Sequence, residues 1–132
     1  MSKPILCLDF DGVIHSYESG WKGADVVPDP PVPGALEFMY DALDHFSVHV
    51  FSSRSNQTGG IDAMKNWMHK WAAALLGEGR FEDDPMLCWL ERITYPTEKP
   101  PALLTIDDRA LTFDGTWPSM QTIKEFKPWN KR

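Results

Sequence analysis

Short hydrophobic segments that end in polar residues recur along the chain. The first, residues 5–8, is uninterrupted, and two further segments rich in strand-forming residues occupy 48–51 and 102–106. An uninterrupted apolar run is typical of a strand that is covered on both faces, as in a parallel sheet. We therefore expect three strands of one sheet at these positions.

The segments between these strands have the periodicity of amphipathic helices. A first helix is expected to begin at Pro33-Gly34, with an apolar face made of Leu36, Met39, Tyr40, Leu43 and Phe46. The clearest apolar stripe follows the second strand and comprises Ile61, Met64, Trp67, Met68, Trp71, Leu75 and Leu76. This spacing predicts a long helix and places Trp67 and Trp71 in the core. A last helix is expected at about 119–126.

Two stretches have no clear period. Residues 13–33 contain four prolines and are predicted to form a long loop. Residues 78–98 are predicted to contain one short strand, at 87–90 or at 93–95. Alternating strands and helices indicate an α/β fold with a mainly parallel central sheet and helices on both faces. A length of 132 residues fits a single domain, 1–132.

Composition limits the cellular compartments and the classes of partner that we expect for the chain. Hydrophobic residues make up 42%, enough for a core, yet no apolar run reaches the roughly 20 residues of a membrane helix. The two cysteines, Cys7 and Cys88, form neither a disulfide framework nor a zinc motif, so we expect a reducing cytoplasm. A net charge of −6 argues against broad nucleic-acid binding. Residues 124–132 are locally basic, either as a solvated tail or as a substrate contact.

Polar residues of complementary chemistry follow each expected strand. These candidates are Asp9 and Asp11 after the first strand, Ser52, Ser53 and Arg54 after the second, and Asp107 and Asp108 after the third, with Lys99 just before it. The carboxyl ends of parallel strands share one edge of a sheet, where ligands bind. Carboxylates, a hydroxyl group and a cation at one edge suit a hard metal ion together with a phosphate group.

These residue types support a mechanism of phosphoryl transfer. A phosphate dianion repels an attacking carboxylate, and Mg²⁺ bound between them would offset this repulsion. Asp9 is the expected nucleophile and would form an aspartyl-phosphate. Asp11 would protonate the leaving oxygen and later deprotonate water. Ser52 would donate a hydrogen bond to the phosphate, and Lys99 would neutralise charge.

The same residues resemble the four motifs of the haloacid dehalogenase superfamily, in the family's order. Residues 9–14, Asp-Phe-Asp-Gly-Val-Ile, look like motif I, Ser52 like motif II, Lys99 like motif III, and Asp107-Asp108 like motif IV. The resemblance implies a Rossmann-like three-layer fold with a flap, about 13–33, after motif I. It also implies a magnesium-dependent phosphatase, because the family's dehalogenase and phosphonatase branches lack an aspartate at the position of Asp11.

The resemblance implies a ligand set as well. Mg²⁺ is expected on the Asp9 carboxylate, the Asp11 backbone carbonyl and Asp107, with Asp108 acting directly or through water. Residues 13–33 and 78–98 are too short for a cap domain. Capless members often act on large substrates such as phosphorylated polymers, so a nucleotide or polynucleotide end is an alternative to a small phosphomonoester.

Several assignments stay open on the sequence alone. Ser53 could replace Ser52 as the phosphate ligand, and Arg54 could bind phosphate or pair with a nearby carboxylate. Asp108 could instead pair with Arg109. His15 and Trp21 could each touch substrate or serve only the fold. A rival of another class is a binding or regulatory module without turnover, although no motif residue is missing.

Overall fold

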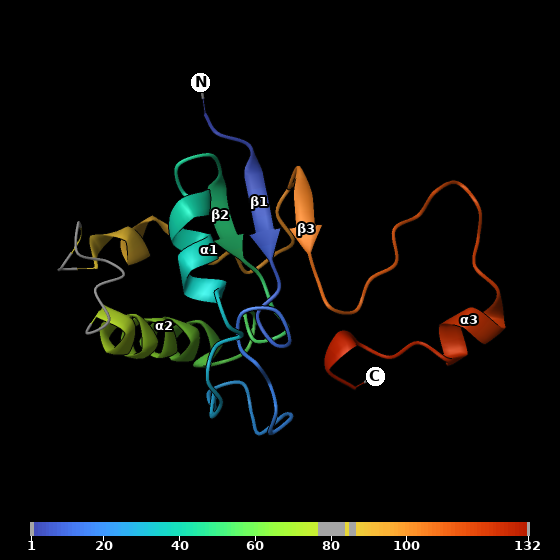
Figure 1. Cartoon of the computed structure of the whole chain (residues 1–132), viewed down its shortest axis with the longest axis horizontal. Helices are drawn as coiled ribbons and strands as arrows, with labels where there is room; N and C mark the ends of the chain where they lie inside the picture. The colour runs from blue at the N-terminus through green and yellow to red at the C-terminus, as the bar shows by residue number, and fades with distance from the viewer. Residues whose placement is uncertain (1, 77–83, 85–86, 132) are drawn as a thin grey trace.

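The sheet consists of three parallel strands. The computed structural model describes residues 2–76, 84 and 87–131. Strands β1 (Ile5–Leu8), β2 (Ser47–Val50) and β3 (Leu104–Ile106) pair in the order β2-β1-β3 (Figure 1). The expected α/β class with a parallel sheet is thereby confirmed. The observed second and third strands differ from 48–51 and 102–106 by one or two residues at their ends.

Two helices supply a large part of the core outside the sheet. Helix α1 (Ala35–Ala42) begins after Gly34, whose φ of 85° is the left-handed conformation that glycine adopts without strain. Helix α2 (Gly60–Leu76) buries Met64, Trp67 and Met68. Trp71 is only half-buried, so its predicted place in the core holds in part.

Strand register brings the candidate residues to a common level. Leu8 of β1 lies opposite Val50 of β2 and Ile106 of β3. The backbone N–H of Asp9 donates to the carbonyl oxygen of Ile106 at 3.0 Å, which extends this pairing by one residue. Asp9 and Asp107 therefore leave the sheet side by side.

The segment before β3 differs from expectation. Residues 88–92 form the 3-10 helix η1 (Cys88–Arg92) rather than a strand. Thr94 makes an isolated parallel bridge to His49, so the strand expected at 87–90 or 93–95 is reduced to one bridge. Residues 78–83, 85 and 86, which belong to the same stretch, lie outside the described residues.

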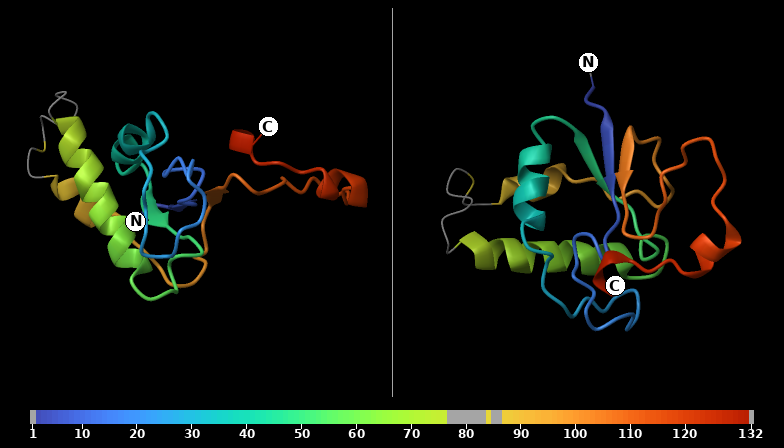
Figure 2. Two further views of the ribbon diagram at one scale, coloured as in Figure 1. Left: turned by 90° about the horizontal axis from the view of Figure 1, so that it is seen from below. Right: turned by 45° about the vertical axis from the view of Figure 1, so that its right-hand side comes forward.

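The carboxyl-terminal segment leaves the sheet after β3. Figures 1 and 2 show it extending from the β3 side, whereas α1 and α2 gather near β2. It contains α3 (Met120–Lys124), shorter than the expected 119–126 and with no buried residue, and the 3-10 helix η2 (Trp129–Lys131). Its exposed apolar side chains include Phe113, Trp117 and Ile123. In the described part of the chain, no helix has the length and apolarity needed to cross a membrane.

Candidate metal and phosphate site

Three carboxylates meet at the carboxyl ends of β1 and β3. Asp9, Asp107 and Asp108 each place one carboxylate oxygen within 4.8 Å of those of the other two. Asp9 and Asp108 are partly buried, and Asp107 is exposed. The Asp107 side chain accepts a hydrogen bond from the Arg109 backbone N–H at 2.8 Å, which fixes the turn after β3. Parallel pairing of β1 and β3 thus creates a compact acidic cluster.

Gly12 lets Asp108 approach the loop after β1. Its φ is 85°, and a Cβ atom built at this position would overlap the Asp108 carboxylate. Asp108 is also tied loosely to Arg109, with 3.9 Å between Oδ2 and Nε. The predicted alternative of an Asp108–Arg109 pair is therefore present, but as a long contact to a largely exposed cation.

We expect Gly12→Ala to weaken metal binding and to destabilise the protein. The positive φ alone costs about 1–2 kcal/mol for a residue with a side chain, and the overlap must in addition displace Asp108. Gly34→Ala is the matched control, because Gly34 has the same φ of 85° and nothing within 4 Å of its built Cβ. Urea unfolding and Mg²⁺ titration calorimetry compare the two. Equal Mg²⁺ affinities would show that the approach of Asp108 to Gly12 is unimportant.

The surroundings of Asp9 disfavour its negative charge. Burial, a hydrogen bond with Asp108 and repulsion from Asp107 together raise the pKa of Asp9 to about 8. The Oδ1 atom of Asp108 is buried and has no hydrogen-bond partner among the described residues. Such an orphaned acceptor is costly unless a ligand satisfies it.

These features fit a hard divalent cation. Carboxylate oxygens are the ligands that Mg²⁺ prefers, and a bound cation would relieve the mutual repulsion of Asp9, Asp107 and Asp108. It would also give the Asp108 Oδ1 atom a partner. The Asp11 carboxylate is not part of this group.

Asp11 is held by two cationic or polar partners. Arg54 donates from Nε to both carboxylate oxygens at 3.2 and 3.0 Å and from Nη2 to Oδ1 at 3.1 Å. His15 Nδ1 lies 2.8 Å from the same Oδ1. Burial raises the pKa of Asp11, but the hydrogen bonds from His15 and Arg54, together with the charge of the Arg54 guanidinium, outweigh it and lower that pKa below the ordinary value.

Arg54 also clamps the loop that follows β1, where the flap was expected. Its Nη1 donates to the carbonyl oxygens of Gly23, Ala24 and Val26 at 2.9–3.0 Å, and its side chain is fully buried. The sequence left two roles open for Arg54, a contact to phosphate or a pair with a nearby carboxylate. In this structure its donors serve Asp11 and the flap, which is the carboxylate-pairing alternative.

His15 is a buried member of this network that sequence reasoning left undecided. Its Nε2 accepts from the Asp29 backbone N–H at 3.1 Å, so the ring hydrogen must lie on Nδ1 and point to Asp11. Phe10 and Trp67 pack against the ring, at 5.5 and 5.6 Å between centroids. The only hint in the sequence is a histidine four residues after Asp11, which by itself carries little information.

Ser52 lies in a tight turn after β2. Its Oγ accepts from the Arg54 backbone N–H at 3.1 Å, and its own N–H donates to Ser55 Oγ at 3.0 Å. The Ser52 hydroxyl hydrogen is thus available for another acceptor. Ser53 is exposed and uses its carbonyl oxygen to accept from Gln57 Nε2. The turn favours Ser52 over Ser53 as the buried donor.

Lys99 lies near the site but is not locked to it. Its side chain is exposed, and no hydrogen bond or ion pair joins it to another described residue. Burial raises the pKa of the Cys7 thiol, which also senses the charges of Asp9, Lys99 and Asp107. Lys99 therefore lies within electrostatic reach of the strand that carries Asp9, without the direct contact that its motif assignment suggests.

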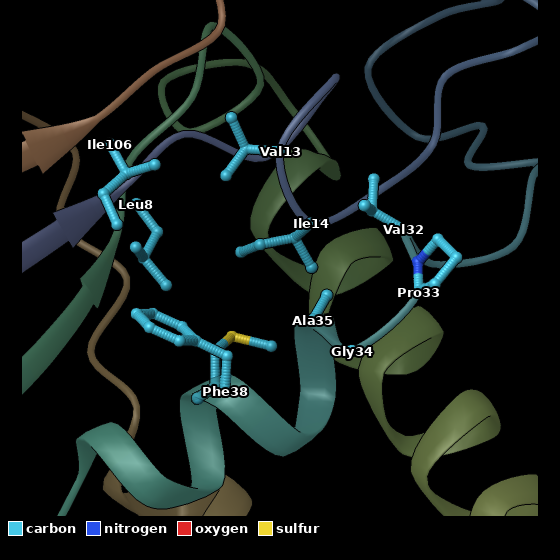
Figure 3. A pocket seen from close by; sticks show the side chains of 10 residues that line it. Leu8, Val13, Ile14, Val32, Pro33, Gly34, Ala35, Phe38 and Ile106 are labelled. Atoms are coloured by element: carbon cyan, nitrogen blue, oxygen red, sulfur yellow. The ribbon is translucent and has the colours of Figure 1, made fainter.

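An apolar pocket adjoins the acidic cluster. It has a volume of about 370 Å³ and is lined without any charged side chain, by residues that include Leu8, Ile106, Val13 and Phe38 (Figure 3). Leu8 and Ile106 immediately precede Asp9 and Asp107, so strand alternation turns them to the other face of the sheet. The pocket therefore offers packing surface but no chemistry.

Comparison with known proteins adds no assignment. No protein-family model matches the chain, and neither a curated protein nor a solved structure is detectably similar to it.

Proposed function

We propose that this protein is a magnesium-dependent phosphomonoester hydrolase of the haloacid dehalogenase type, with Asp9 as nucleophile. The observation that carries the proposal is the cluster of Asp9, Asp107 and Asp108 at the carboxyl ends of two parallel strands. Asp11 lies in the loop after β1 and Ser52 in the turn after β2, which is the order of motifs I and II in the family. The small α/β fold is compatible with this family.

Asp9, Asp107 and Asp108 would hold Mg²⁺ through their carboxylates, together with the Asp11 carbonyl. When bound, the ion would supply positive charge that offsets repulsion between the substrate and the acidic cluster. Lys99, whose charge acts on Cys7 in the strand that leads to Asp9, would add a second positive charge. The Ser52 hydroxyl would donate to a phosphate oxygen and orient the group for attack.

The chemistry proceeds in two halves. A carboxylate oxygen of Asp9 attacks phosphorus while the bond to the leaving oxygen breaks, and that oxygen takes a proton from Asp11. Water then attacks the phosphorus of the aspartyl-phosphate, and Asp11 accepts its proton. Inorganic phosphate leaves and the Asp9 carboxylate is restored.

The hydrogen bonds around Asp11 affect whether its carboxyl group acts more readily as the acid of the first step or as the base of the second step. Because His15 and Arg54 lower the pKa of Asp11, it is ionised in the free protein and ready to act as a base. To act as an acid it must first take up a proton as the substrate arrives. Like-charge repulsion from a phosphate dianion favours that uptake.

Phosphate release from an aryl phosphate tests the proposal. We expect release that depends on Mg²⁺ and stops when a chelator is added, and that resumes when Mg²⁺ is restored. A protein that binds phosphate and Mg²⁺ but releases none from a panel of monoesters would be the rival binding or regulatory module. Release that continues undiminished in excess chelator would contradict the proposed chemistry.

Magnesium affinity is expected to rise with pH. In the metal-free protein Asp9 is protonated below its pKa of about 8, and it must lose that proton to bind the ion. Affinity should therefore increase by up to about tenfold per pH unit below pH 8 and level off above it. Titration calorimetry across this range measures the effect, and Asp9→Asn should flatten the dependence. Equal wild-type affinities throughout would show that Asp9 is not a ligand.

A further inference from the structure

The end of the described chain returns to the loop after β1. Trp129 Nε1 donates to the Gly12 carbonyl oxygen at 2.7 Å, and Asn130 Nδ2 donates to that of Ser16 at 3.4 Å. The right-hand view of Figure 2 shows η2 beside this loop. Gly12 follows Asp11 and packs against Asp108. Trp129 is thus anchored next to the acidic cluster, while 51% of it stays exposed.

A second tryptophan reaches the same turn from the flap. The Trp21 ring lies over the Arg54 guanidinium, with 4.9 Å between Cζ and the ring centroid. Arg54 in turn binds Asp11, and Trp21 is 46% exposed. Two half-exposed indole rings are therefore each connected, through a single residue, to the turn that carries Asp9 and Asp11.

Other groups of the same character surround this turn. Burial raises the pKa of the Tyr17 phenol, which also senses Asp11, Arg54 and Arg109, so Tyr17 lies near all three. Arg109 is 62% exposed directly after Asp108. Lys131, two residues beyond Trp129, is exposed as well. Tyr17 and Arg109 thus lie beside the acidic cluster, and Lys131 follows the anchored Trp129 along the chain.

We infer that the site takes phosphomonoesters of nucleotides, and that Trp129 stacks on the base next to the phosphate. The inference rests on the phosphatase proposal and specifies its substrate class. Indole rings stack on every base through its π-face, which gives affinity without sequence preference. Arg109 and Lys131 would meet the next phosphates of a strand, whereas the net charge of −6 opposes wider contacts.

A nucleobase fits this arrangement better than a phosphotyrosine ring. In phosphotyrosine the phosphate is attached directly to the ring, so the ring would have to lie over Asp9 itself. A sugar separates base from phosphate in a nucleotide, which lets the base reach a platform anchored at Gly12, three residues after Asp9. The exposed cations Arg109 and Lys131 could bind further phosphates of a nucleic-acid strand, whereas a single aryl group offers them no partner.

Binding to the inactive variant Asp9→Asn tests the inference without turnover. The probes are an end-phosphorylated oligonucleotide, the same oligonucleotide with an abasic terminal residue, a mononucleotide and a phosphotyrosyl peptide. In the Asp9→Asn background, Trp129→Ala should weaken oligonucleotide binding by roughly 5- to 150-fold, the equivalent of one stacked base. It should leave binding of the abasic oligonucleotide unchanged.

Two further variants separate stacking from structure. Trp117→Ala removes a tryptophan that is 83% exposed in the same segment and should bind like the parent. Trp129→Phe lacks the N–H donated to Gly12 but keeps a ring, and should retain most of the binding. Equal losses in Trp129→Phe and Trp129→Ala, equal effects on the abasic probe, or preferential binding of the peptide would each overturn the inference. If a mononucleotide binds as tightly as the oligonucleotide, the site recognises only the terminal nucleotide, and the inferred contacts with further phosphates are wrong.

The same measurements distinguish failure of the phosphatase proposal from failure of the inferred substrate class. If wild type releases no phosphate from aryl or nucleotide esters while the base-dependent binding persists, the chemistry fails and the nucleotide site stands. If Mg²⁺-dependent release occurs without any dependence on Trp129 or on the terminal base, the chemistry stands and the inferred substrate class fails.

Discussion

Asp9→Asn is expected to lower phosphate release by about 10⁴- to 10⁶-fold, as removal of an enzyme nucleophile does. Asparagine has nearly the same shape, but its neutral amide cannot attack phosphorus to give an aspartyl-phosphate. Steady-state release from an aryl phosphate, with saturating Mg²⁺, measures the loss.

The fold should survive this change. Asp9 is a carboxylic acid whose anion is disfavoured by burial and by Asp108 and Asp107, so a neutral amide removes an unfavourable charge. We expect Asp9→Asn to unfold in urea at the same concentration as wild type, or at a higher one. Asp107→Asn is the matched control, because it removes a metal ligand and not the nucleophile. Its activity should recover at higher Mg²⁺, whereas that of Asp9→Asn should not. Substantial activity in folded Asp9→Asn would exclude Asp9 as nucleophile.

Arg54→Ala is expected to reduce the free energy of unfolding by about 3–5 kcal/mol, the usual effect of removing one partner of a buried ion pair. The change would leave the buried Asp11 carboxylate without its guanidinium. It would also leave the carbonyl oxygens of Gly23, Ala24 and Val26 without their donor. Urea unfolding at neutral pH measures the difference.

Arg92→Ala provides the comparison for Arg54→Ala. Arg92 is exposed, and its Nη2 donates to the single carbonyl oxygen of Leu43 at 2.9 Å. Its removal should cost no more than about 1 kcal/mol, typical of one hydrogen bond, because Lys3 Nζ also donates to the Leu43 carbonyl oxygen. If Arg54→Ala and Arg92→Ala lose the same small amount, the clamp between Asp11 and the flap does not stabilise the fold.

Local patterns were sufficient to predict the sheet and its two main helices. The apolar run at Ile5–Leu8 and the stripe of α2 are dictated by side chains that must be buried together. The 3-10 helix η1 was not foreseen, because it begins after Leu87 in a left-handed conformation with φ of 55°. No local preference of leucine indicates such a conformation, which tertiary packing must impose.

The candidate site was predictable only where it follows from strand order. Asp9, Asp107 and Asp108 meet because β1 and β3 are parallel neighbours. The partners of Asp11 could not be derived in this way. Arg54 and His15 reach it only because irregular loops fold over the end of the sheet, and irregular loops have no period to read.

In the proposed mechanism, Asp9 accepts the phosphoryl group beside a metal ion held by Asp107 and Asp108. A crystal structure with beryllium fluoride, which mimics a phosphoryl group, and Mg²⁺ tests it most directly. We predict the fluoride complex bonded to an Asp9 carboxylate oxygen, with Ser52 Oγ donating to a fluorine and Mg²⁺ among the three aspartates. A complex bonded to another residue, or bound at Asp9 without Mg²⁺, would contradict the account.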